Sequence, residues 1–194
     1  MIKIYDDLFS KELSDKIENF VLNDNFAWFF NSVSTATNLL NIKSKNVKEY
    51  IMFTHKFYDW DWDKKETYQN SPHDDLVLDF EKVIRPGLKI KNFNLMRFKA
   101  NFLPKINMKK DNYNLPHQDF PNIKTKVILY YVNDSDGDTF FFDNPDKLNI
   151  IKRVKPKKGR VVHFDGHLIH ASTHPSKSDK RVCININYYD RTQF

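Results

Sequence analysis

Apolar residues recur at helical spacing in two segments of the first half of the chain. Ser10 can cap the first segment. Its apolar positions are Leu13, Ile17, Phe20 and Val21. Asp74 or Asp75 can cap the second segment, which ends at Pro86-Gly87. Its apolar positions are Leu76, Phe80, Val83 and Ile84. The spacing predicts two helices, each with one apolar face that packs on the core.

From residue 93 onward apolar and polar residues alternate, which is the period of a β-strand. Turns rich in Asn, Asp, Gly or Pro separate the alternating segments. The predicted strands are Phe93–Phe102, Thr125–Asn133, Thr139–Phe142, Leu148–Val154, Arg160–Phe164 and Arg181–Tyr189, with a short additional strand at Ile2–Tyr5. At least six closely spaced strands after two helices predict a mostly β protein, a sandwich or barrel buttressed by N-terminal helices.

Two aromatic stretches of the first half show no regular period. Residues 26–30 are expected to be extended and to lead into a polar loop over residues 31–38. Residues 55–75 are rich in Tyr, Trp and Asp, which predicts a long loop. Loops of this length are often functional, and this one would form a wall of a substrate site. The equal alternative is a set of aromatic side chains packed under a surface loop.

The length and composition indicate one folded domain. A chain of 194 residues with 40% hydrophobic residues and 17 Phe can bury an aromatic-rich core. We expect residues 1–91 to form helical and aromatic support and residues 92–194 to form the β core of a single domain.

Charge and cysteine content exclude some classes of protein. The formal net charge of +6 comes mainly from lysines spread along the chain, with no five-residue basic block, so we expect a solvated surface rather than a nucleic-acid partner. The single Cys183 excludes an internal disulfide. No signal-peptide core and no apolar stretch of roughly 20 residues is present, which predicts a cytoplasmic protein without a membrane partner.

His117 and Asp119 are the first candidate metal ligands. They are two positions apart, so on an extended segment both side chains project from the same face. Two imidazoles and one carboxylate are the ligand set that holds non-haem Fe(II) and leaves coordination positions open. Four histidines compete for the remaining place, namely His163, His167, His170 and His174. His170, between Ile169 and Ala171 at the start of a strand, fits best from its local context.

The last predicted strand has one polar and one apolar face. Its polar face carries Arg181, Cys183, Asn185 and Asn187, and its apolar face carries Val182, Ile184, Ile186 and Tyr188. If the apolar face packs on the core, the polar face borders a wet cavity in which Arg181 would bind a carboxylate. The alternative is an edge strand with a surface arginine.

In this order, these residues resemble the 2-oxoglutarate and Fe(II)-dependent oxygenases, and within them the prolyl 4-hydroxylase-like branch with its small bacterial and phage members. The resemblance covers roughly the C-terminal half of the chain. It is carried by residues 97–101, 117–119, 129–133, 136–140, 156–160, 164–166, His170 and Arg181. Asp136-Gly137-Asp138-Thr139 stands where the family usually has Gly-Gly-x-Thr, a departure in a turn that leaves the ligands untouched.

The resemblance implies a double-stranded β-helix, a jelly-roll barrel, and a role for each candidate residue. His117, Asp119 and His170 would be the iron ligands, and family register selects His170 among the four histidines. Arg181 would pair with the distal carboxylate of 2-oxoglutarate, and Tyr131 would hydrogen-bond to it. Asn185 and Asn187, on the same strand face as Arg181, are further candidate contacts to the co-substrate.

The resemblance also implies a reaction, in which Fe(II), 2-oxoglutarate and O2 hydroxylate a C–H bond and release succinate and CO2. Asp119 as a ligand favours hydroxylation over halogenation. A protein or peptide side chain such as proline is the leading substrate by analogy of fold. A free amino acid, another small molecule or a nucleobase is the alternative, although Asn187 stands where the AlkB-type demethylases carry a second arginine. A non-catalytic barrel that acts as a binding module is a third hypothesis.

Overall fold

The computed structural model describes residues 1–33, 41–109 and 111–193. It contains two α-helices, α1 (Lys11–Val21) and α2 (Asp74–Gly87), and a short 3₁₀ helix, η1 (Arg191–Gln193). The strands of the described residues are β1 (Lys3–Tyr5), β2 (Phe29–Asn31), β3 (Met52–Asp61), β4 (Glu66–Gln69), β5 (Phe93–Pro104), β6 (Thr125–Tyr131), β7 (Thr139–Phe142), β8 (Ile150–Val154), β9 (Val161–Asp165), β10 (His170–Ser172) and β11 (Lys180–Asp190).

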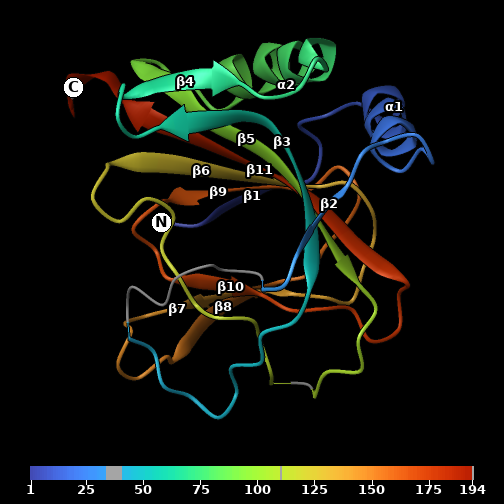
Figure 1. Cartoon of the computed structure of the whole chain (residues 1–194), viewed down its shortest axis with the longest axis vertical. Helices are drawn as coiled ribbons and strands as arrows, with labels where there is room; N and C mark the ends of the chain where they lie inside the picture. Colours follow the sequence, from blue (N-terminus) through green and yellow to red (C-terminus); the bar gives the residue numbers. More distant parts are fainter. Residues whose placement is uncertain (34–40, 110, 194) are drawn as a thin grey trace.

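The strands form two antiparallel sheets. The large sheet has the order β1-β9-β6-β11-β5-β3-β2, with β4 paired to β3. The small sheet has the order β10-β7-β8. Figure 1 shows the small sheet below the large one, and α1 and α2 on the opposite side of the large sheet. This is the predicted mostly β jelly-roll, a double-stranded β-helix supported by two helices.

The alternation along β6 and β11 explains why the large sheet has a layer on each face. Ile128 and Tyr130 of β6 and Ile184 of β11 lie in the cluster that includes Phe80 of α2. Their neighbours in sequence, such as Leu129, face the other way and pack with residues of the small sheet. The prediction that the aliphatic face of the last strand packs on the core, with its polar face toward a cavity, is therefore confirmed.

All six predicted strands of the second half are present, with ends that differ by a few residues. Ser10 caps α1 as expected, because its hydroxyl accepts a hydrogen bond from the backbone N–H of Leu13 at 3.2 Å. The prediction of an aspartate cap for α2 is wrong. His73 precedes the helix, and Asp74 and Asp75 lie in its first turn, where carboxylates interact favourably with the helix dipole. Pro86-Gly87 forms its last residues.

The prediction that residues 55–75 form one long loop is also wrong. Most of this segment belongs to β3, β4 and the first residues of α2, and β3 and β4 pair as a hairpin. The register of β3 against β5 shifts between Lys56 and Tyr58. Because such a bulge reverses the alternation of side chains, the sequence of β3 has no steady period. Phe57 is fully buried in the core.

The extended segment predicted over residues 26–30 overlaps the short strand β2, which extends one residue further, to Asn31. Of the polar loop predicted over residues 31–38, residues 34–38 lie outside the described part of the chain. Within the described residues, neither helix has the length and apolar content that a bilayer span requires.

Candidate metal centre

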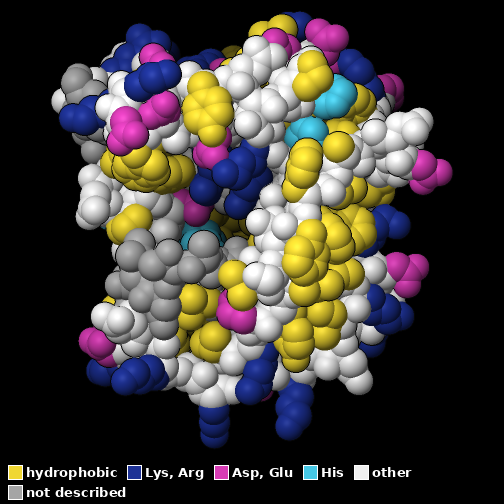
Figure 2. Space-filling model, in the orientation of Figure 1, with side chains coloured by type: hydrophobic (Ala, Val, Ile, Leu, Met, Phe, Trp, Pro, Cys, Tyr) yellow, Lys and Arg dark blue, Asp and Glu magenta, His cyan; other side chains and the backbone are white. Residues whose placement is uncertain are grey.

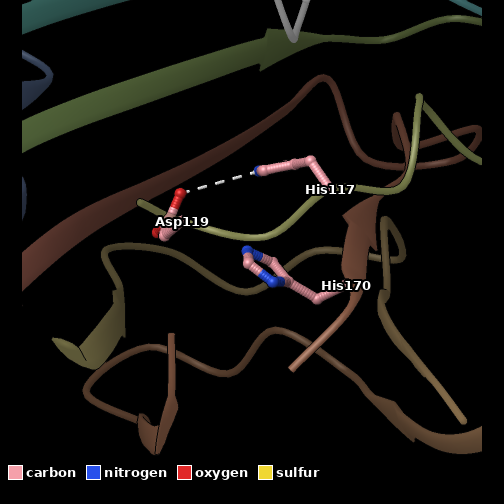
Figure 3. A group of neighbouring side chains, drawn as sticks. All are labelled: His117, Asp119 and His170. Carbon is pink, nitrogen blue, oxygen red and sulfur yellow. Dashed lines mark ion pairs between the residues drawn. The ribbon is translucent and has the colours of Figure 1, made fainter. Parts of the chain in front are cut away.

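His117, Asp119 and His170 meet at one end of the space between the two sheets. His170 begins β10, and His117 pairs with it in an isolated antiparallel bridge whose two backbone hydrogen bonds are both 3.0 Å long. One donor atom from each of the three side chains lies within 4.8 Å of the others. Figure 3 shows the two rings and the carboxylate pointing into a common space. Among the four candidate histidines, the structure places only His170 beside the His117–Asp119 pair in the described part of the chain.

Backbone carbonyls set the tautomers of both histidines. Nδ1 of His117 lies 3.1 Å from the carbonyl oxygen of Leu115, and Nδ1 of His170 lies 2.9 Å from that of Leu168. Since a carbonyl can only accept, each Nδ1 carries the proton and donates it. With Nδ1 as the donor, Nε2 is the ring nitrogen of each histidine that can offer a lone pair to a metal, which is the arrangement of a metal-ligating histidine.

Asp119 is buried, and both of its oxygens accept hydrogen bonds. Arg97 donates to Oδ1 at 3.1 Å, while Asn185 and Asn187 donate to Oδ2 at 3.1 and 2.9 Å. Burial by itself raises the pKa of this carboxyl, but the positive charge of Arg97 and the surrounding donors outweigh burial and hold the pKa well below its usual value. Asp119 is therefore ionised at neutral pH.

The protonation state of the group suits a divalent cation. Burial lowers the pKa of His117 to about 4, and the neighbouring His170 adds to the effect. At neutral pH the site thus presents an anionic carboxylate and a neutral His117 imidazole, as metal binding requires. Two imidazoles and one carboxylate are a donor set that fits Fe(II).

The pKa values of two partly buried histidines predict a loss of stability in acid. Burial lowers the pKa of His117 and of His163 from 6.5 to about 4. Below pH 6.5 these histidines become protonated in the unfolded chain but stay neutral in the folded chain. The free energy of unfolding of the metal-free protein should therefore fall between pH 6.5 and 4, by roughly 2 kcal/mol per histidine. Urea unfolding at stepped pH measures this, and His163→Gln should reduce the slope. A flat profile over this range would contradict the burial of neutral rings.

Arg97 is itself held in position from two sides. Its Nε donates to Oδ1 of Asn187 at 3.0 Å. The ring of Phe120, a residue with a positive φ of 51°, lies against its guanidinium at 4.6 Å, and Trp62 packs on Phe120 at 5.9 Å. The β3–β4 hairpin, which carries Trp62, is in this way connected through packed side chains to a candidate ligand.

Replacing Arg97 by Met should weaken metal binding by about 10- to 100-fold, because outer residues that orient a ligand contribute that much to affinity. The dissociation constant of Mn(II), measured by electron paramagnetic resonance, reports the change. Arg153→Met is a matched control, since Arg153 also lies 4.6 Å from a Phe ring and pairs with a carboxylate at 2.7 Å, on the small sheet away from the pocket. Equal Mn(II) affinity in both variants would exclude a positioning role for Arg97.

Arg181 lies at the other end of the same pocket. It is only 2% exposed, and its guanidinium donates to the carbonyl oxygen of Gly137 and to the hydroxyl of Thr139, both at 2.8 Å. Its third nitrogen lies 3.5 Å from Sγ of Cys183. Within the described residues no carboxylate forms an ion pair with Arg181 and its three nitrogens contact neutral groups, while the charge of Asp138 acts on it from beyond ion-pair distance. A buried guanidinium of this kind favours an anionic ligand.

The unusual turn before Thr139 builds this end of the pocket. A Cβ on Gly137 would lie 2.5 Å from the carbonyl oxygen of Thr173, so a larger residue would displace the backbone. The carboxylate of Asp136 accepts hydrogen bonds from the backbone N–H groups of residues 176–178. The aspartate that departs from the family pattern therefore anchors the loop that leads into β11.

The pocket connects the three candidate ligands with Arg181. It is lined by Met52, Arg97, Lys99, Asn101, Leu103, His117, Asp119, Leu129, Thr139, Phe164, His170, Ser172, Arg181, Cys183 and Asn185. Figure 2 shows a hollow on this face in which basic, acidic and histidine side chains come together. The sequence pattern alone was not used to assign a role to Arg97 and Lys99 of β5. Their alternation with apolar residues nevertheless places them, together with Asn101, on one face of the strand.

The other predicted contacts lie around the pocket in different ways. Tyr131 is fully buried and does not line the cavity; its hydroxyl lies 2.6 Å from that of Thr139, and burial raises its pKa to about 12. Asn185 and Asn187, which the sequence predicts to contact the co-substrate, both donate to Asp119, and Asn185 also lines the cavity. Tyr131 is therefore linked to Arg181 through Thr139.

The three remaining histidines have other partners. His163 lies on β9, which pairs with β1. His167 is exposed beside Asp165, with Nδ1 3.3 Å from the carboxylate. His174 is buried, and its Nδ1 lies 2.8 Å from the carbonyl oxygen of Pro104.

No protein-family model and no curated protein matches the sequence, so the comparison with known proteins rests on solved structures. An oxidoreductase of the 2OG-Fe(II) oxygenase family from Burkholderia pseudomallei superposes with a TM-score of 0.66 at 12% identity, over 98% of this chain and 88% of that one. A prolyl hydroxylase from Trichoplax adhaerens, solved with a peptide of hypoxia inducible factor, gives a TM-score of 0.63 at 12% identity, over 98% and 84%.

The chain has the fold of the 2-oxoglutarate and Fe(II)-dependent oxygenases. The solved structures that share this fold contain different bound molecules. HygX from Streptomyces hygroscopicus, solved with nickel, 2-oxoglutarate and hygromycin B, superposes with a TM-score of 0.58 at 11% identity, over 97% of this chain and 82% of that one. The resemblance carried by the C-terminal half of the sequence is thus confirmed for the fold, over nearly the whole chain.

Proposed function

We propose that this protein is an Fe(II) and 2-oxoglutarate-dependent dioxygenase that hydroxylates a C–H bond. The observation that carries the proposal is the presence, in one pocket, of the His117, Asp119 and His170 group and of the buried Arg181 without an acidic partner among the described residues. The first binds a divalent cation, and the second binds a carboxylate. 2-Oxoglutarate is a ligand that can bind both the cation and Arg181.

The three candidate ligands would hold iron through Nε2 of each histidine and a carboxylate oxygen of Asp119. Bound iron would supply the oxidation, in which O2 and 2-oxoglutarate give succinate and CO2 and one oxygen atom enters a substrate C–H bond. Arg97, Asn185 and Asn187 keep Asp119 ionised and oriented. Because Asp119 occupies the third ligand place, hydroxylation is favoured over halogenation.

Arg181 would orient 2-oxoglutarate by binding its distal carboxylate. Gly137 and Thr139 hold the guanidinium in place, so it does not have to be ordered when the ligand arrives. Tyr131 supports Thr139 from behind and would act on the co-substrate through that hydroxyl. The low exposure of Arg181 strengthens the pairing with a carboxylate.

We propose a protein or peptide side chain, such as proline, as the class of substrate. The prolyl hydroxylase of similar fold that was solved with a peptide supports this choice, while HygX, solved with hygromycin B, keeps a small molecule as the alternative. The proposal treats the chain as one domain. Residues 1–91 contribute β1 and β3, which pair with β9 and β5 of the remaining chain.

Two measurements test the proposed chemistry. Calorimetry under anaerobic conditions should show 2-oxoglutarate binding to the Fe(II)-loaded protein and none to the metal-free protein. In air, the loaded protein should convert 2-oxoglutarate to succinate. Mass spectrometry of peptides, amino acids and alkylated oligonucleotides incubated with it should find one class of compound whose mass changes. Failure of the loaded protein to bind 2-oxoglutarate would refute the proposal.

A further inference from the structure

Lys99 enters the pocket from the wall formed by the large sheet. On β5 its side chain points to the same face as those of Arg97 and Asn101, and all three line the cavity. Lys99 pairs in register with Asn185 on β11, whereas Leu103 pairs with Arg181. At about 3.4 Å per residue, the rows of Lys99 and Arg181 are roughly 13 Å apart along the strands. The two cations therefore serve different parts of the cavity.

Lys99 differs from the other two cations of the pocket because its ammonium has no hydrogen bond or ion pair among the described residues. Arg97 donates to Asp119 and Asn187, and Arg181 donates to Gly137 and Thr139. Among the hydrogen bonds and ion pairs of the described residues, none involves the ammonium of Lys99. Burial lowers the pKa of Lys99 to about 8, and the positive charge of Arg97 adds to this, while Asp119 opposes it. An ammonium in such a place is stabilised by an anion.

The charges of the pocket leave a positive excess that a further anionic group would reduce. Among the described residues its lining contains three basic side chains and one carboxylate, that of Asp119. Divalent iron raises the positive total from three to five, and 2-oxoglutarate raises the negative total from one to three. Two positive charges then remain, and Arg97 and Arg181 already have partners in Asp119 and the distal carboxylate. The group without a counter-charge is Lys99.

We propose that Lys99 binds a carboxylate of the primary substrate, so that the substrate is an acid. This inference rests on the proposed function, because it presumes that 2-oxoglutarate occupies Arg181 and the metal. The carboxylate belongs either to a small acid or to an acidic residue of a peptide. In both cases it lies beside the wall formed by β5 and Asn185, the wall whose Arg97 and Asn185 contact the candidate ligand Asp119.

The test uses the whole chain with Zn(II) and saturating 2-oxoglutarate at pH 7, a state that binds but does not turn over. The probes are pairs that differ in one charge: N-acetyl-L-proline and N-acetyl-L-prolinamide, N-acetyl-L-aspartate and N-acetyl-L-asparagine, and pentapeptides with a central Asp or Asn. Calorimetry gives the affinities. Protein labelled with ¹³C-lysine gives the Lys99 signal, which is assigned by its loss in Lys99→Met.

Lys99→Met and Lys99→Arg are the variants, and Lys56→Met is the matched control. Lys56 is the cross-strand partner of Lys99 on β3, but it is exposed and its ammonium pairs with Asp59 at 2.5 Å. Lys99→Met removes a charge that has no partner, so its melting temperature should not fall below that of the wild type. Lys99→Arg keeps the positive charge and should keep the preference for acids.

The expected result is that at least one acid binds tenfold or more tightly than its amide and shifts the Lys99 signal. Lys99→Met should abolish that preference and leave 2-oxoglutarate affinity within about twofold of wild type. Equal binding of acids and amides, or no binding of any acid, overturns the inference. A tenfold loss of 2-oxoglutarate affinity in Lys99→Met also overturns it, because Lys99 would then hold the co-substrate. If the wild type binds an acid at Lys99 but never 2-oxoglutarate, the proposed function fails and the carboxylate site stands.

Discussion

Replacing His170 by Ala should abolish Fe(II) binding and the conversion of 2-oxoglutarate to succinate. The substitution removes one of three donor atoms that lie within 4.8 Å of one another, and the pair that remains, His117 and Asp119, is insufficient for a stable iron site. Turnover should fall by at least about 10³-fold, to the background of free iron, since bound iron supplies the oxidation. Succinate release and metal content after desalting measure the two effects.

His167→Ala is the control for this prediction, because His167 is the competing histidine nearest in sequence. Its side chain is 47% exposed and lies beside Asp165, and its backbone carbonyl, which accepts a hydrogen bond from Gln118, is unchanged by the substitution. This variant should bind iron and release succinate as the wild type does. If His167→Ala lost activity while His170→Ala retained it, the assignment of the ligand set would be wrong.

Replacing Arg181 by Ala should raise the KM for 2-oxoglutarate by about 100-fold or more while iron binding persists. The guanidinium of Arg181 is buried and is held by Gly137 and Thr139. A charge-assisted pair of hydrogen bonds from it to a carboxylate contributes roughly 3 kcal/mol or more to binding. Arg181→Lys should fall between Ala and wild type, since an ammonium cannot form the bidentate pair. Initial rates of succinate release at varied 2-oxoglutarate measure the change.

Arg160→Ala is the control for loss of an arginine that forms a partly buried ion pair elsewhere. Arg160 binds Asp6 through Nε and Nη2 at 2.6 and 2.9 Å, remote from the pocket lining. Its KM for 2-oxoglutarate should be that of the wild type. Thermal unfolding of both variants separates a folding defect from a binding defect. An unchanged KM in a folded Arg181→Ala protein would rule out Arg181 as the site of the distal carboxylate.

Local patterns were sufficient for those parts of the protein whose period is regular. The α1 helix with its Ser10 cap, the six strands of the second half and the two faces of β11 follow from residues that are near one another in sequence. His117 and Asp119 are similarly local, because two residues on an extended segment share a face. The choice of His170 rested chiefly on the family resemblance, since local context favoured it over the other three histidines without excluding them.

The rest depended on contacts between distant strands. The bulge in β3 interrupts the strand period, so the sequence pattern predicted a loop there. The shift in register arises only when β3 pairs with β5. Asn185 and Asn187 were expected to meet the co-substrate, and only the tertiary structure brings Asp119 between them and Arg97. A residue's period tells which face its side chain takes, and this much the sequence determined. Which groups from other strands meet it on that face, and so whether Lys99 is left without a counter-charge, is decided by the packing of the two sheets.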